Sequence, residues 1–171
     1  MVYLLISLGM GLSVAGSVLV AQHTGAGDED RAEYAASQTV TFAVIASVLL
    51  GVIGYRFVGD FLGLLGASAD VLPLASSYME VVSLGLVAMF GFAVFVALMR
   101  GYGDTVTPMM VMFGSVVLNI ALDPFLIFGW GPFPALGIEG AAIATVGSRA
   151  LALVVGLAIM FRGTCGVQIN A

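Results

Sequence analysis

Residues 108–128 read PMMVMFGSVVLNIALDPFLIF, an apolar run whose single charged residue is Asp123. About 20 such residues in a helix cross the hydrocarbon core of a bilayer, so this run predicts a membrane-spanning helix. Further runs of similar character are separated by short segments that are polar or rich in glycine and proline; they cover 2–21, 39–58, 76–99 and 137–161. The sequence predicts an all-α integral membrane protein of about five transmembrane helices, with residues 1–171 in a single domain.

The composition supports a lipid environment. Hydrophobic residues make up 61% of the chain and charged residues 9%, and the mean hydropathy is +1.15. Soluble domains carry about 25% charged residues, so these 171 residues cannot cover themselves with a surface suited to water. The formal net charge of -5 argues against nucleic acid as a partner, because nucleic-acid binding needs basic patches.

Few residues are available for catalysis or for a resident metal. The chain has one cysteine and one histidine, which excludes an intramolecular disulfide and a Cys/His metal cluster. It contains no phosphate-binding loop and no nucleophile-elbow serine. We therefore expect neither an enzyme nor a protein with a bound cofactor.

The arginines predict the orientation. With five spans, Arg31, Arg100 and Arg162 fall on one side of the membrane, and Arg56 falls on the other. Cytoplasmic loops carry the excess of basic residues, so the Arg31 and Arg100 loops are expected in the cytoplasm of a multi-pass protein of the cell membrane.

The helix ends also have sequence signals. The turns GAGD at 25–28 and GYGD at 101–104 each predict a glycine that ends one helix and an aspartate that caps the next. Thr107 followed by Pro108 predicts the N-cap and first residue of the fourth span. The acidic group at 28–33 is expected on a loop. Small residues recur every fourth position in the first and last spans, which predicts close helix packing there.

Asp123 is the strongest candidate for function. A charge near the centre of a spanning helix costs about 2.5–3.5 kcal/mol on insertion scales, so such a residue normally faces the protein interior or an ion path. Asn119 lies one turn earlier on the same face, and Pro124 frees the carbonyl of Ile120 from its helical bond. These oxygens suit a small cation or a proton. A neutral, hydrogen-bonded Asp123 that serves packing alone is the alternative.

Two other charges lie inside predicted spans. Glu80 is expected about five residues from a helix start, where a role in the transport pathway and simple contact with the membrane interface are equally compatible with its position. Arg149 shares a helix face with Thr145, and could reach the interface, pair with an acid or line a cavity.

Several motifs occur in a fixed order along most of the chain. They are LVAQHTGAGD at 19–28, RGYGDTVTP at 100–108, LNIALDP at 118–124 and GIEGAAIAT at 137–145. Together they resemble the multidrug and toxic compound extrusion (MATE) family of secondary transporters, whose members have twelve helices in two lobes and exchange sodium ions or protons for organic cations.

The resemblance implies a partial N-terminal lobe. The chain matches helices two to six, while the first helix and the C-terminal lobe have no counterpart in residues 1–171. Asn119 and Asp123 match positions of the family's N-lobe cation site, and Thr145 matches its threonine on the sixth helix. The resemblance thus implies a sodium or proton site at these three residues, with small organic cations as the exported solutes.

Other functions fit the same features. The chain could belong to a related lipid or polysaccharide flippase, although the acid and amide on the fourth span favour cation coupling. It could also be a non-transporting remnant or a structural membrane subunit, in which case a second chain could supply the missing helices.

Overall fold

A computed structural model describes residues 2–66, 68, 70–129 and 134–161, and this part of the chain is helical with no strands. The helices are α1 (Val2–Gly25), α2 (Glu29–Leu64), α3 (Leu72–Leu84), α4 (Leu86–Gly101), α5 (Val106–Phe128) and α6 (Ile138–Phe161). The predicted all-α fold is confirmed.

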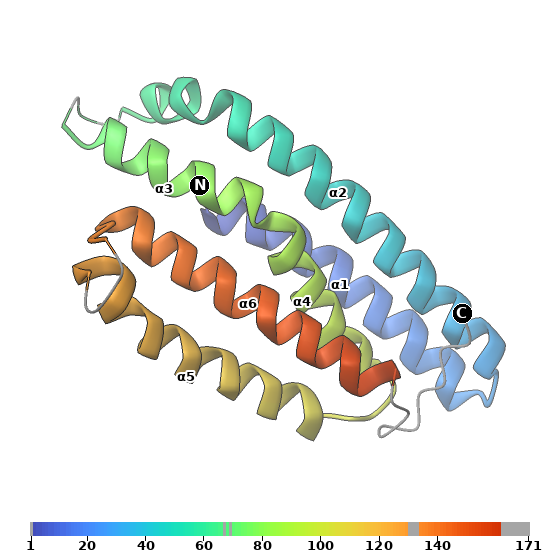
Figure 1. The fold of residues 1–171 in the computed structure, drawn as a ribbon. Helices are drawn as coiled ribbons and strands as arrows, with labels where there is room; N and C mark the ends of the chain where they lie inside the picture. The colour runs from blue at the N-terminus through green and yellow to red at the C-terminus, as the bar shows by residue number, and fades with distance from the viewer. Residues whose placement is uncertain (1, 67, 69, 130–133, 162–171) are drawn as a thin grey trace.

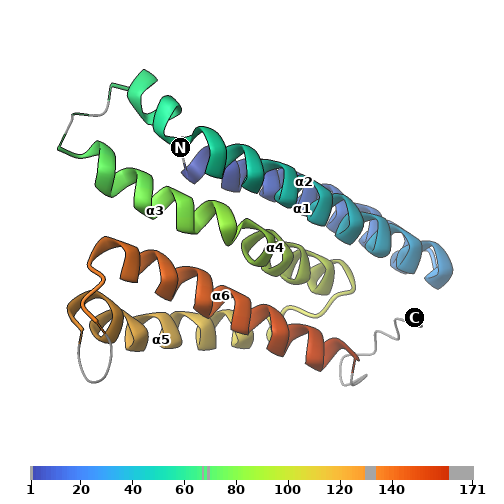
Figure 2. The ribbon, with the colours of Figure 1, turned by 45° about the horizontal axis from the view of Figure 1, so that its top comes forward.

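The helices form three layers. Figure 2 shows the α1–α2 pair on one side, the α5–α6 pair on the other, and α3 followed by α4 between them. The middle layer contacts both pairs, since α4 packs on α1, α2 and α6, and α3 packs on α2 and α6. Buried residues of α4, such as Phe90, Phe95 and Leu98, therefore supply side chains to all the core clusters of the described residues.

Many large apolar side chains remain exposed on the outside of this bundle, among them Phe42, Phe57 and Phe113. Within the described residues, three helices are long and apolar enough to cross a membrane: α2, α5 and α6. Counted as one span, the bent pair α3 and α4 would give a fourth crossing. Helix α1 covers the first predicted span. The exposed apolar surface is the one that lipid would cover.

The third predicted span is not continuous. α3 and α4 meet at Gly85 with a bend of 54°, where the Gly85 N–H donates to the Val81 carbonyl and the next bond runs from the Met89 N–H to the Gly85 carbonyl. The prediction of one helix over 76–99 was wrong because apolar composition does not reveal the break. Gly85 lies against the Val146 side chain of α6, and a Cβ at this position would overlap it.

The turn between α1 and α2 contains the predicted glycine and the predicted capping aspartate. Gly27 has a φ of +73°, a conformation that favours glycine, and the Asp28 carboxylate accepts a hydrogen bond from the Arg31 N–H. The expectation of an acidic loop was wrong, because Glu29, Asp30 and Glu33 all lie in α2. Carboxylates at a helix N-terminus are stabilised by the positive end of the helix dipole.

The segment between the second and third predicted spans is shorter than expected, because α2 continues to Leu64 and α3 begins at Leu72. At the start of α5, Asp104 rather than Thr107 is the capping side chain. Its carboxylate accepts hydrogen bonds from the N–H groups of Val106 and Thr107, each at 3.0 Å. The helix therefore begins before Pro108, which is its third residue.

Small residues bring helices together as predicted. On α6 the whole stripe is buried: Gly140, Ala144, Ser148, Ala152 and Gly156. On α1 the prediction holds for Gly9 and Ser13, whereas Ser17 is half-buried and Ala21 is exposed.

Gly140 offers a matched test of this packing. A Cβ added to Gly140 would overlap the Leu126 carbonyl of α5, whereas a Cβ on Gly147 of the same helix meets nothing within 4 Å. Gly140→Ala should destabilise the chain by about 1–3 kcal/mol, the usual cost of overpacking. Gly147→Ala should be neutral or slightly stabilising. Thermal unfolding in detergent micelles compares the two, and equal effects would contradict the packing described.

Arg31, near the start of α2, and Arg100, near the end of α4, lie at the same end of the bundle. Figure 1 shows that the α1–α2 turn and the α4–α5 loop lie at the same end, opposite the α5–α6 connection. Tyr102 lies in the α4–α5 loop, and its burial, together with the nearby Glu33 carboxylate of α2, raises its pKa. Arg162, the third arginine expected on this side of the membrane, lies outside the described residues.

We expect this end to face the cytoplasm. In a Cys165→Ser background, Asp30→Cys and Thr105→Cys should resist an impermeant thiol reagent added outside intact cells, because both exposed positions belong to the arginine-bearing end. Glu139→Cys, exposed at the other end, should react. Rapid outside labelling of Asp30→Cys and Thr105→Cys would reverse the topology.

Candidate functional site on α5 and α6

Asn119 and Asp123 lie one turn apart on α5, and both are half-buried. The helix continues through Pro124 to Phe128. Because proline has no N–H, the carbonyl of Ile120 lacks its usual helical partner. Three oxygen-bearing groups are thus available over one turn of an apolar helix.

α6 brings Thr145 to the same level. The Ser115 hydroxyl of α5 donates to the Ser148 carbonyl of α6 at 3.2 Å. Near the other end of the pair, Gly140 in the first turn of α6 packs against Leu126 of α5. In this antiparallel pair, Asn119 is one turn beyond Ser115 and Thr145 is three residues before Ser148. Asn119 and Thr145 are therefore at a similar level along the helix pair, and Asp123 is one turn further along α5.

The polar groups of this region are only partly satisfied. The Thr145 hydroxyl donates to the Ala141 carbonyl at 2.9 Å, which leaves its oxygen able to accept or to bind a cation. The Asn119 amide nitrogen is buried and has no hydrogen-bond partner among the described residues. Asp123 forms no hydrogen bond or ion pair with any residue that the structure describes. A buried amide beside a carboxylate without a partner is costly for packing alone.

The oxygens of Asp123, Asn119 and Thr145 are of the kind that bind small cations. The described residues contain no group of three or more His, Cys, Asp or Glu that could hold a metal ion. One carboxylate, one amide and one hydroxyl are instead hard oxygen ligands of low total charge. Such a set suits a monovalent cation or a proton that must bind and leave.

Glu80 does not lie where the sequence suggested. It is in the second half of α3, which begins at Leu72 and ends at Leu84, so help from a helix N-terminus does not apply. Its side chain is half-buried. Glu80 is on the middle layer, and nothing in the described residues joins it to Asp123.

Arg149 makes a contact that the sequence did not predict. Its guanidinium carbon lies 5.0 Å from the centroid of the Phe92 ring of α4. The only ion pair among the described residues is the exposed one between Arg31 and Asp28. Arg149 is thus a charged, half-buried residue in the middle of an apolar helix, positioned over a ring that itself packs against Phe95.

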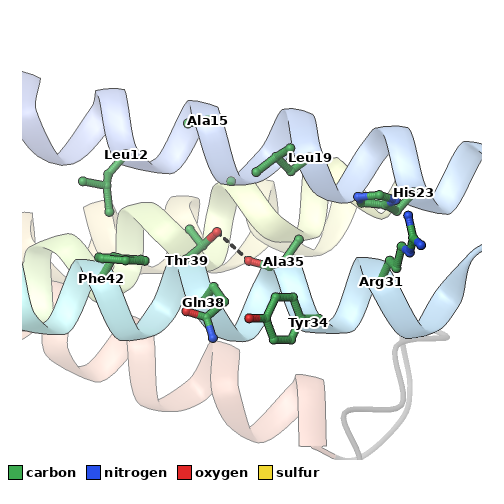
Figure 3. A pocket seen from close by; sticks show the side chains of 11 residues that line it. Leu12, Ala15, Leu19, His23, Arg31, Tyr34, Ala35, Gln38, Thr39 and Phe42 are labelled. Atoms are coloured by element: carbon green, nitrogen blue, oxygen red, sulfur yellow. Dashed lines mark hydrogen bonds between the residues drawn. The ribbon is translucent and has the colours of Figure 1, made fainter.

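A groove of about 550 Å³ between α1 and α2 was missed by the sequence analysis. Figure 3 shows His23 and Arg31 at one end, and Leu12 and Phe42 at the other. Thr39 lies between these ends, and its hydroxyl donates to the Ala35 carbonyl at 2.7 Å. Residues of both α1 and α2 line the groove. The sequence alone does not show which residues of the two helices face each other.

Comparison with known proteins decides the family. The protein-family model described as MatE matches residues 1–125. The chain belongs to the MATE family. This MATE chain is 38% identical over 144 residues to the probable multidrug resistance protein YoeA of Bacillus subtilis, covering 84% of the chain and 31% of YoeA. It is 37% identical over 149 residues to the FAD transporter of Shewanella oneidensis, covering 86% of the chain and 32% of that protein.

Solved structures agree with the fold. An inward-facing MATE multidrug transporter superposes with a TM-score of 0.88 at 28% identity, over 97% of this chain and 37% of the other. The MATE chain thus spans about a third of the length of the relatives it matches. It is a multi-pass membrane protein of a transporter family.

Proposed function

We propose that this MATE chain forms part of a secondary transporter that exports small organic molecules in exchange for sodium ions or protons, with the coupling ion bound at Asp123, Asn119 and Thr145. The main support is the half-buried Asp123 carboxylate without a described partner, one turn from an amide whose buried nitrogen is also unpartnered. Thr145 adds a hydroxyl oxygen from the neighbouring helix.

The coupling follows from competition at one side chain. A carboxylate inside the membrane can be neutralised by a proton or by a metal cation, and each excludes the other. Binding of the ion from one side and its release to the other would bias the two arrangements of the lobes around the site. Asp123 is then the group whose charge changes, and Asn119 and Thr145 are further ligands of the coupling ion.

Two substrate classes are compatible with the relatives. The family resemblance implies organic cations, and the relative from Bacillus subtilis is named a probable multidrug resistance protein. The relative from Shewanella oneidensis is named an FAD transporter, and FAD is a phosphate-bearing solute. The flippase alternative has no such support among these relatives, and the candidate cation ligands argue against a purely structural subunit.

The test uses a complete transporter in which this chain is joined to the remaining segments of a MATE relative. The purified protein is reconstituted into proteoliposomes loaded with a fluorescent solute. Efflux should follow an imposed sodium gradient or an imposed proton gradient and should stop when that gradient is dissipated. Efflux at an equal rate with no ion gradient would contradict ion-coupled transport.

A further inference from the structure

Arg149 lies midway along the apolar part of α6, which runs over Ile138–Ile159. The alternatives open to an arginine at this depth are a protein carboxylate, contact with the membrane surface, or a ligand. Among the described residues no acid pairs with it. Its central position and half-buried state separate it from the lipid headgroups at either end of the helix.

Beyond its contact with Phe92, the Arg149 guanidinium forms no hydrogen bond or ion pair with the residues that the structure describes. The guanidinium carbon lies over the Phe92 ring, 5.0 Å from its centroid. The ring attracts the positive charge through its π-face, and such a contact does not require the guanidinium N–H donors. Phe92 is itself 5% exposed and fixed in the core. The Arg149 head group is therefore positioned over a core ring, and its hydrogen-bond donors have no partner among the described residues.

Arg149 also belongs to the same region as the candidate ion site. It is one turn from Thr145 on α6, so the two side chains share a helix face. Ser148, next to Arg149, accepts a hydrogen bond from Ser115 of α5, one turn before Asn119. A solute near Arg149 would lie about two turns along the helix pair from Asp123, within the span of a small organic molecule.

We infer that Arg149, held by Phe92, binds the carboxylate or phosphate group of the transported solute. This deepens the proposed function, on which it rests, by naming an acidic group that the solute carries, including the acid of a zwitterionic drug. An in-plane pair of N–H donors fits such a planar or tetrahedral oxyanion bidentately. The unpaired charge of Arg149 would then be neutralised whenever solute is bound.

The experiment measures the accessibility of Arg149 in the 171-residue chain in lipid nanodiscs. The arginine reagent phenylglyoxal is applied with 1-naphthyl phosphate or with 1-naphthol, which share the aromatic part but differ in the anionic group. Labelling of each arginine is quantified by mass spectrometry. Naphthyl phosphate should slow labelling of Arg149 about tenfold, whereas naphthol should have little effect. Arg56, exposed on α2, is the internal control and should not change.

A variant series provides the second measurement. Arg149→Gln should lower the affinity for naphthyl phosphate about tenfold and leave that for naphthol unchanged, while Arg149→Lys should retain part of the difference. Unfolding temperatures check that the variants fold. Equal protection by both compounds, protection by neither, or unchanged phosphate affinity in Arg149→Gln would overturn the inference. An Arg149 that resists labelling without any added compound would also overturn it and indicate a protein carboxylate already in place. None of these readouts depends on an ion gradient, so their failure is distinguishable from failure of coupled transport.

Discussion

Residues 1–171 reconstituted by themselves should give no solute efflux above that of protein-free vesicles. Alternating access requires two halves that move against each other around a central site. This chain spans about a third of the length of its MATE relatives, and its described helices form a single three-layer bundle. No second half is available to close the opposite side of the site.

The comparison uses equal amounts of this chain and of the complete transporter, measured in the same lipid and under the same sodium or proton gradient. Dye-labelled protein and vesicle flotation confirm that both are inserted. Gradient-dependent efflux by the chain at a rate similar to the complete transporter would contradict the expectation, unless crosslinking shows an oligomer in which a second copy supplies the other half.

Much of this architecture could be predicted from sequence because lipid imposes simple rules on the chain. Apolar runs long enough to span a bilayer mark helices, since backbone groups in lipid must be satisfied within the helix. The capping aspartates Asp28 and Asp104 were also predictable, because their side chains act on N–H groups only two or three residues away. The buried stripe on α6 followed from its four-residue spacing.

What could not be predicted depends on contacts between distant parts of the chain. The break at Gly85 is accommodated by Val146 of α6, about 60 residues further along the sequence. Phe92 is one of many phenylalanines, and only the packing of α4 on α6 shows that it meets Arg149. The acidic start of α2 was misread as a loop because charge alone does not separate a solvated turn from a first helical turn that favours carboxylates.

Asp123→Asn in the complete transporter should abolish ion-driven efflux while leaving expression and membrane insertion intact. The amide keeps the size of the side chain but removes the charge that a sodium ion or proton neutralises. Asn119→Ala should have a smaller effect, about 5- to 10-fold, because other oxygens could still reach the ion. Asp60→Asn, at an exposed position of α2, is the matched control and should transport normally.

The most direct test of this account compares two modes of transport in the same Asp123→Asn proteoliposomes. One mode is efflux driven by an imposed sodium or proton gradient, and the other is exchange of labelled for unlabelled solute with no ion gradient. We predict that exchange continues while the gradient no longer drives efflux, because the variant still binds solute but has lost the site of the coupling ion. Full gradient-driven efflux by Asp123→Asn, at the rate of the unsubstituted protein, would contradict the account and leave Asp123 with a role in packing.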